Sequence, residues 1–395
     1  MTESPDERQG TVREVFLAFL KLGLTSFGGP VAHLGFFQTV FVRERQWLDG
    51  RAYAELIALC QFLPGPASSQ VGMAIGLHRA GPGGALAAWF AFTAPSALLM
   101  IVAGLTLSGT DLSQHAGLLQ GLKAAAVGVV AWAIWGMARS LTPDFRRLTI
   151  AALACLLAVF VPTVLGQLSG IVLGAALAHW LVPESDTTAG GGLRLAIGRR
   201  GAVLAGALFI TGLLGLPLLA GLGSQMAVTV LDSMYRAGAL VFGGGHVVLP
   251  LLHAETVQTG MISSDSFLAG YGLAQAMPGP LFSFSGLIGS SAGGVGMGLL
   301  AVVAIFLPGS LLVLAILPFW ERVRGNQRVR RLLGGVNAAV VGILAAAFYD
   351  PVMTAGLSQG RDLIVALAII AALAWGRVPV WMLIMLAAVA GSLFL

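Results

Sequence analysis

Apolar residues run along this 395-residue chain in long unbroken stretches and do not alternate with polar ones. Residues 86–107, 117–137 and 378–395 are clear examples. A helix needs about 20 apolar residues to cross the roughly 30 Å of hydrocarbon in a bilayer. The strands of a membrane β-barrel would instead alternate between lipid-facing and lumen-facing residues. The pattern therefore predicts an all-α integral membrane protein.

Several apolar segments are too short to cross a bilayer. Residues 31–42, 53–63 and 67–78 hold 12, 11 and 12 residues, and at about 1.5 Å per residue each is roughly 18 Å long. Glycine and proline clusters separate them, so we expect half-length helices that pair into re-entrant hairpins. In the first half we expect hairpins at about 12–42 and 52–79, then spans at about 84–107, 116–138, 148–162 and 164–182.

The same succession restarts after a glycine- and arginine-rich linker at 183–200 and a single span at about 201–222. The second half should hold hairpins at about 226–258 and 264–292, then spans at about 294–318, 332–349, 362–376 and 378–395. The copies can be aligned by residue, since 121–128 recurs as 335–342, an offset of 214. The same offset relates Gln61-x-x-Pro64-Gly65-Pro66 to Gln275-x-x-Pro278-Gly279-Pro280.

This repetition predicts three parts: a first repeat at 1–182, a linker with its linking span at 183–222, and a second repeat at 223–395. Each repeat would contain two re-entrant helical hairpins and about four transmembrane helices. Because a single span lies between the repeats, the second should be inverted in the membrane. Inverted-topology repeats are the architecture of many secondary transporters.

The composition agrees with a membrane protein, and the distribution of charge predicts how the protein is oriented in the membrane. The chain is 57% hydrophobic and 10% charged, against about 25% charged residues in soluble domains. The net charge of +5 comes from arginines in short loops, so it indicates orientation and not a nucleic-acid partner. We expect a multi-pass protein of the cell (inner) membrane, with a cytoplasmic N-terminus and an external C-terminus. Ser4 should cap an amphipathic first helix that continues towards Phe27.

Breaks inside apolar helices are the first candidate chemistry. A broken helix in a bilayer leaves backbone groups unpaired, at several kcal/mol each, and is tolerated where it lines a polar cavity. Helices that start after Pro66 and Pro280 would present N–H groups and a partial positive charge to an anion. The alternative is that the glycines only allow close helix packing. The candidate residues at the breaks are Ser26, Gly28, Gly29, Pro64, Gly65, Pro66, Ser68 and Ser69, then Gly243, Gly244, Gly245, Pro278, Gly279, Pro280, Ser283 and Ser285.

Cations in apolar segments are the second candidate. Lys21 and Lys123 are the two lysines, and both lie in apolar segments, where charge is costly and usually functional. Lys21 and Arg236 each lie seven residues before a glycine cluster, whereas the repeat partner of Lys123 is the neutral Asn337. We expect a cationic lining for a multiply charged oxyanion. The alternative is that these side chains extend to the membrane interface.

Histidines and glutamines at the breaks allow more than one role. His33 and His246 could carry a proton near neutral pH or donate to the carbonyls of the break. Gln61 and Gln275 could donate to a substrate or cap the broken backbone. No cysteine or histidine spacing matches a metal site, and no nucleotide-binding glycine loop is present. We therefore expect neither a metal nor another cofactor.

Phe27-Gly28-Gly29-Pro30 with His33, and the Gln-x-x-Pro-Gly-Pro motif, each with its second-half copy, resemble the chromate ion transporter (CHR) family in its long two-domain form. The resemblance covers nearly the whole chain. It implies export of chromate from the cytoplasm and chromate resistance, with sulfate as the mimic of the substrate. The second copy departs from the first, because Gly245 and Ala269 stand where Pro30 and Glu55 stand.

The predicted function is secondary transport that exports a tetrahedral dianion, driven by the membrane potential, with proton coupling left open. Its partners would be chromate or sulfate, the lipid bilayer and, as an option, a second copy in a homodimer. Rival hypotheses are sulfate uptake and an anion channel. An intramembrane enzyme using His33 or His246 would lack a nucleophile–base pair, so we expect no enzyme.

Overall fold

The computed structural model describes residues 10–109, 116–161, 163–182, 198–223, 225–242, 247–320 and 326–394. These residues are almost entirely helical, and no strand occurs among them. The first half comprises α1 (Val12–Thr25), α2 (Gly29–Phe37), the π-helical η1 (Gln38–Glu44), α3 (Gly50–Phe62), α4 (Ala67–Gly109), α5 (Ala116–Leu141), α6 (Phe145–Phe160) and α7 (Val164–Leu181).

The second half begins with the linking helix α8 (Arg199–Leu222). It continues with α9 (Met226–Leu240), α10 (Val248–Leu252), η4 (His253–Val257), α11 (Ser264–Ala276), η5 (Leu281–Ser283), α12 (Phe284–Ile316), η6 (Leu317–Phe319), α14 (Gln327–Ala347), η7 (Phe348–Met353), α15 (Thr354–Gly356), α16 (Gly360–Trp375) and α17 (Val380–Phe394). The predicted residues Gly243, Gly244, Gly245 and His246 lie outside the described residues.

Helices end and begin at the predicted breaks. The break between α1 and α2 has Gly28 and Gly29 at φ of +100° and +76°, a left-handed conformation that glycine adopts without a steric cost. Gly65 and Gly279, at the centres of the two Pro-Gly-Pro segments, have φ of +115° and +89°.

The longest helices, α4 and α12, each fold back on themselves. Their regular geometry is interrupted at Ala80–Gly81 and at Gly293–Gly294. In α4, Gly76 of the first arm lies against Gly84 of the second, although eight residues of straight helix would separate them by about 12 Å. The first arm is therefore the predicted half-length helix, and the second is the span after it.

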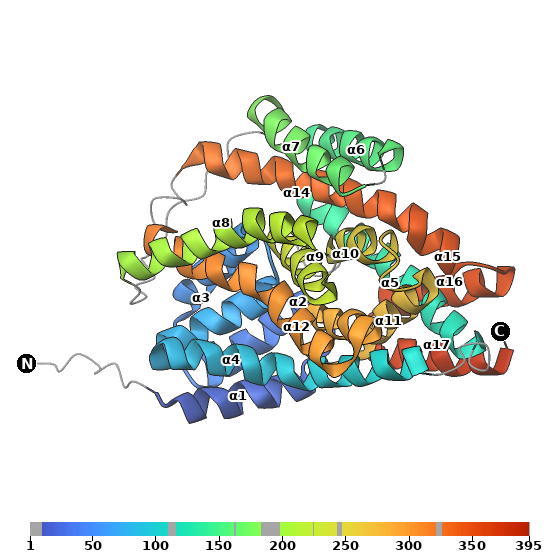
Figure 1. Ribbon diagram of the computed structural model, residues 1–395, viewed down its shortest axis with the longest axis horizontal. Coiled ribbons are helices and arrows are strands. Elements are labelled where there is room, and N and C mark those ends of the chain that lie inside the picture. Colours follow the sequence, from blue (N-terminus) through green and yellow to red (C-terminus); the bar gives the residue numbers. More distant parts are fainter. Residues whose placement is uncertain are drawn as a thin grey trace, which may run out of the picture.

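Helix contacts recur between equivalent positions of the two halves, at offsets of 214 or 215 residues. Gly23 of α1 lies against the backbone of Ala91 in α4, and Gly238 of α9 lies against that of Ile305 in α12. Likewise α5 packs with α16 and α17, whereas α14 packs with α6 and α7 (Figure 1). Small residues at these crossings let the helix backbones approach closely. The two halves also meet where α4 packs against α12.

Five helical segments among the described residues are long and apolar enough to cross a membrane, namely Ala67–Ser108, Ala116–Leu141, Arg199–Leu222, Leu281–Phe319 and Gln327–Gly356. The linking helix α8 exposes large apolar side chains along most of its length, including Val203, Leu208, Leu214 and Leu218. A contiguous exposed apolar surface of this kind suits contact with lipid.

The start of the first helix differs from the prediction. Thr11 has an extended backbone and its hydroxyl accepts a hydrogen bond from the N–H of Glu14 at 3.1 Å, so Thr11 is the N-cap and α1 begins at Val12. A continuous helix from Ser4 to Phe27 is therefore wrong. Ser4 itself lies outside the described residues.

Candidate functional site

The Pro-Gly-Pro break of each half is hydrogen-bonded to the other half. The N–H of Gly65 donates to the carbonyl oxygen of Val241 at 2.7 Å, and the N–H of Gly279 donates to that of Ser26 at 2.9 Å. Ser26 and Val241 each lie just before the glycine cluster of their half. The same bond is therefore made twice between equivalent positions, and it brings the broken ends of α1, α9, α3 and α11 to one region.

Glycine is required at the centre of both Pro-Gly-Pro breaks for two reasons. Gly65 and Gly279 have left-handed backbones, which strain any residue with a Cβ. The surroundings are also tight: a Cβ on Gly65 would lie 2.9 Å from Nε2 of Gln70 and 3.0 Å from the Cα of Gly309. A Cβ on Gly279 would lie 2.9 Å from Oγ of Ser96. These glycines allow the peptide N–H groups to reach across between the halves.

His33 joins the two breaks of the first half. Its ring is buried, with Nε2 3.2 Å from the carbonyl oxygen of Ser26 and Nδ1 3.4 Å from Oγ of Ser68. With the proton assigned to Nε2, the ring donates to Ser26 and accepts from Ser68. The edge of the ring packs against Phe92. Of the two predicted roles for His33, these contacts favour a donor that binds the carbonyls of the break.

Two unsatisfied donors lie at the breaks of the first half, Ser26 at the end of α1 and Ser69 in the first turn of α4. The hydroxyl oxygens of Ser26 and Ser69 are buried and have no hydrogen-bond partner among the described residues. The first N–H groups of a helix have no acceptor within it, and α4 begins at Ala67. Buried polar groups are normally satisfied, so an unpaired cluster calls for an explanation such as a ligand. Donor groups beside the positive end of a helix suit an anion.

The second half presents fewer free donors at its Pro-Gly-Pro break. The hydroxyls of Ser283 and Ser285 donate to the carbonyl oxygens of Pro280 and Phe282, at 2.8 and 2.9 Å. The N–H of Ser283 also bonds to Pro280, because the chain starts here with the 3-10 turn η5. In this conformation these serines stabilise the start of their own helix. They are therefore not the free donors that we expected from the sequence.

Sequence reasoning missed Gln70, which caps the first break. Its Nε2 donates to the carbonyl oxygens of Pro64 at 2.8 Å and Gly309 at 3.1 Å. This is the capping role proposed for Gln61, which instead is exposed. Gln275 is buried and interacts with Tyr271. The position equivalent to Gln70 is Phe284, so no repeated motif pointed to this residue.

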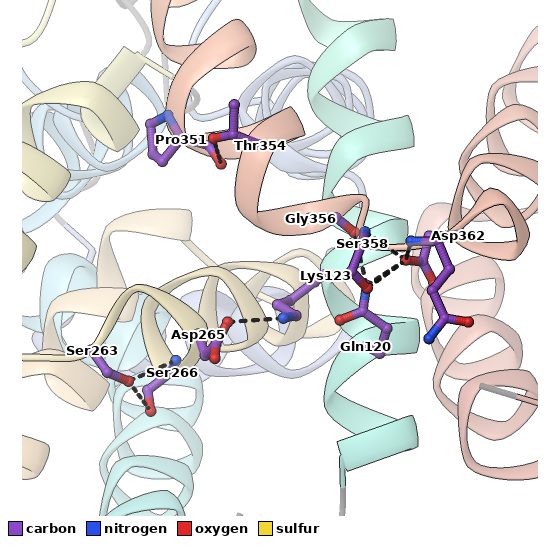
Figure 2. Close-up of polar contacts among 11 residues, drawn as sticks. Gln120, Lys123, Ser263, Asp265, Ser266, Pro351, Thr354, Gly356, Ser358 and Asp362 are labelled. Carbon is purple, nitrogen blue, oxygen red and sulfur yellow. Dashed lines mark hydrogen bonds and ion pairs between the residues drawn. The ribbon is translucent and has the colours of Figure 1, made fainter.

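Two of the three predicted cations are paired with carboxylates. Nζ of Lys123 lies 2.8 Å from Oδ1 of Asp265 (Figure 2). Nη2 of Arg236 lies 2.9 Å from Oδ2 of Asp232 and 2.8 Å from Oε2 of Glu255.

The third predicted cation, Lys21, is exposed on α1 and has no carboxylate partner among the described residues. Asn337, the neutral repeat partner of Lys123, is partly buried on α14. Among these ion pairs, only Asp232–Arg236 could be predicted from the sequence, because residues four apart lie on the same face of a helix. Asp265 and Glu255 come from other elements, so proximity along the chain could not indicate them.

A polar cluster on α5 lies one turn before Lys123. Nε2 of Gln120 donates to Oδ2 of Asp362 at 2.7 Å and to the carbonyl oxygen of Gly356 at 3.1 Å. Asp362 also accepts from the N–H and hydroxyl of Ser358, at 2.8 and 2.9 Å. Figure 2 shows Gln120 and Lys123 on α5, bonded to different partner elements. This cluster holds α5 against the start of α16.

A cavity of about 210 Å³ lies elsewhere, among α6, α7, η4 and η7. Its lining includes Gln167, Pro250, His253 and Asp350. It contains none of the break residues, and its carboxylate would repel an anion. The convergent breaks are therefore the better candidate site.

Comparison with known proteins gives consistent matches over nearly the whole chain. A family model described as "Chromate transporter" matches residues 13–180 and 228–392. The "Chromate transport protein" of Pseudomonas aeruginosa is 28% identical over 383 residues, which cover 87% of this chain and 84% of that protein. The "Probable chromate transport protein" of Synechococcus elongatus is 27% identical and covers 97% and 96%.

A third relative, the "Chromate transport protein" of Cupriavidus metallidurans, is 27% identical over 339 residues, covering 85% of this chain and 82% of that protein. No solved structure gives a significant match.

Alanine at Gly65 or Gly279 should destabilise the protein. Forcing a non-glycine residue into the left-handed conformation costs about 1–3 kcal/mol, and the new Cβ would also crowd its neighbours. We expect a lower melting temperature for the purified protein in detergent. Gly35→Ala is the matched control, since Gly35 is helical and a Cβ there meets nothing within 4 Å. Melting temperatures of G65A and G279A at or above that of G35A would contradict this requirement.

Removing the free hydroxyls should weaken oxyanion binding. We expect Ser26→Ala and Ser69→Ala each to lose about 2 kcal/mol of binding free energy, roughly thirtyfold in Kd, because hydrogen bonds to charged groups contribute about that much. Titration calorimetry with chromate and with sulfate measures the loss. Ser310→Ala is the control, because that hydroxyl already has partners within the protein, the carbonyl oxygen of Phe306 and Sδ of Met73. Wild-type affinity in both folded variants would exclude these donors.

Proposed function

This chain belongs to the chromate transporter family, and we propose that it exports chromate, a tetrahedral dianion, from the cytoplasm by alternating access at the convergent helix breaks. The observation that carries the proposal is a pair of buried hydroxyls, those of Ser26 at the end of α1 and Ser69 in the first turn of α4, which have no hydrogen-bond partner among the described residues. Hydroxyl and backbone N–H donors recognise the oxygens of an oxyanion. Sulfate has the same shape and charge, and is the natural competitor.

Neutral donors suit a substrate that must be released. A dianion held by fixed cations in a low-dielectric site would bind too tightly to leave quickly. Helix N-termini and hydroxyls stabilise negative charge through dipoles, which is how discontinuous helices serve anionic substrates in inverted-repeat transporters. Lys123 and Arg236, already paired with carboxylates, then contribute to the scaffold and its movement.

An asymmetry between the halves supports alternating access. The helix α11 packs against α5, and its Gly272 lies against the backbone of Leu122. In the repeat, α3 corresponds to α11 and α14 corresponds to α5. Over the described ranges, α3 packs on α4 and η1 and makes no comparable contact with α14. The α5–α11 contact closes one side of the site. Separation of α5 from α11, together with packing of α3 against α14, would open that side.

The Lys123–Asp265 ion pair lies in this α5–α11 contact. Its repeat counterpart would join Asn337 to Arg51, a pair with one charge. Under the predicted orientation the α5–α11 contact is on the external side. We propose that Lys123–Asp265 is a gate that stabilises the state closed to the outside.

The membrane potential is a sufficient driving force for export. One elementary charge crossing 100 mV is worth about 2.3 kcal/mol. A dianion that leaves a negative interior would gain roughly 4.6 kcal/mol, which corresponds to more than a thousandfold concentration gradient.

Everted membrane vesicles test the direction and the driving force together. Vesicles that contain the protein should accumulate labelled chromate when a potential is imposed, and should lose most of that uptake when the potential is collapsed. Vesicles without the protein are the control. Equal uptake with and without a potential would refute electrogenic export. Accumulation of sulfate in right-side-out vesicles would favour uptake as the function, and unitary currents would favour a channel.

Charge reversal tests the gate. We expect Lys123→Asp and Asp265→Lys each to reduce chromate transport about tenfold, because like charges would separate α5 from α11. The double variant restores an opposite pair in swapped order and should recover most of the transport. Protein amounts in the membrane and gel-filtration profiles control for folding. Single variants with full transport, or a folded double variant as impaired as either single, would remove the gate from the proposal.

A further inference from the structure

Two buried carboxylates share one guanidinium nitrogen in the second half. Asp232 and Arg236 lie one turn apart on α9, and Glu255 approaches from η4. Nη2 of Arg236 is 2.9 Å from Oδ2 of Asp232 and 2.8 Å from Oε2 of Glu255. Asp232 and Glu255 are each only 4% exposed. With all three groups ionised, this triad would carry one uncompensated negative charge.

Among the described residues, no second cation lies within ion-pair distance of either carboxylate. The helix α9 packs against α8, α10, α12 and η4. Among the described residues, α10 and α12 carry no ionisable side chain, and the charges of α8 are the arginines at its first two positions. The charged groups that act on Glu255 are Arg236 and Asp232.

The other ionisable groups nearby have partners of their own. On η4, His253 packs against Phe267 and lines the same cavity as Asp350. On α11, which packs against η4, Asp265 is paired with Lys123. Tyr235, on α9 itself, donates to the carbonyl oxygen of Phe209. The negative charge of the triad is therefore balanced by no described neighbour.

Each carboxyl group keeps one oxygen free. Oδ1 of Asp232 and Oε1 of Glu255 are buried and have no hydrogen-bond partner among the described residues, while the hydroxyl of Ser233 also interacts with the Glu255 carboxylate. An unbalanced buried charge is costly in a membrane protein, and two interacting carboxylates can remove that cost by sharing one proton. The first half lacks this arrangement, since Leu17 and Val40 stand at the positions equivalent to Asp232 and Glu255.

We propose that Asp232 and Glu255 form a proton-binding site of the transporter and take up one proton together with the oxyanion. The inference rests on the proposed transport function. Loading forms one O–H bond at a free carboxylate oxygen, and release breaks that bond and returns the proton to water. Arg236 lies five residues before Val241, roughly 8 Å along the helix. At this distance the negative charge of a dianion at the breaks attracts a proton to the triad. The dianion and the proton therefore stabilise one another.

This coupling fixes a direction for the proton. Because oxyanion binding and protonation favour each other, each raises the affinity for the other by the same factor. The proton therefore travels with the oxyanion, and one net negative charge leaves the cytoplasm in each cycle. The membrane potential then acts on one net charge per cycle, half the charge of an uncoupled dianion, and remains the driving force.

Reconstituted full-length protein tests the proposal. Vesicles with a trapped pH indicator should report protons that move in the same direction as chromate, at mildly alkaline pH where chromate is a dianion. We expect Glu255→Gln and Asp232→Asn to reduce this proton movement about tenfold or more while potential-driven chromate flux persists. Asp144→Asn is the matched control, because Asp144 also pairs with an arginine, Arg147, but lies at the start of α6.

Each result has a distinct meaning. Wild-type proton movement in both variants, or a flux that requires sodium in place of protons, would overturn the proton site. Wild-type protein that carries chromate without protons would also overturn it and would leave the proposed function intact, whereas protein that carries no chromate would refute the proposed function. Where a variant does not fold, infrared spectra of the wild type decide: a protonated carboxyl band that strengthens with chromate supports the site, and its absence overturns it.

Discussion

Backbone hydrogen bonding inside a bilayer is the constraint on which this structure depends. A helix that stops in hydrocarbon leaves N–H and C=O groups without water to bind, and the protein must supply partners. Here the partners come from the opposite repeat, because Gly65 donates to Val241 and Gly279 donates to Ser26. The polar breaks are thereby drawn together, and the interface between the halves is where we propose that an anion binds.

The repeat builds the scaffold, and the departures from the repeat supply the chemistry. Equivalent glycines make equivalent helix crossings in both halves. At the breaks, however, Gln70 caps the first half where Phe284 stands in the second. The free hydroxyl of Ser69 belongs to the first half, and the buried triad of Arg236 belongs to the second. A carrier that must bind an anion on one side of a cycle and release it on the other requires such differences.

In this fold, paired charges are better suited to conformational change of the helices than to binding of the anion. An ion pair across a helix contact can form and break as helices separate, whereas a bare cation facing a dianion would oppose release. Lys123 bonds to Asp265 across α5–α11, and Gln120 bonds to Asp362 across α5–α16. In the proposed transport cycle, α5 is therefore the helix whose contacts would change when the side closed by α5–α11 opens.

The sequence by itself determined the all-helical membrane architecture, the two copies and the positions of the breaks, because apolar run length and the backbone limits of glycine and proline are local properties. It also indicated His33 and the serines as break residues. Only the tertiary structure decided which groups meet: that Ser26 accepts from Gly279, that Gln70 and not Gln61 caps a break, and that Lys123 and Arg236 are neutralised by carboxylates. The physical reason is that a hydrogen bond or ion pair depends on distances of about 3 Å between atoms, and helices packed from distant parts of the chain set those distances.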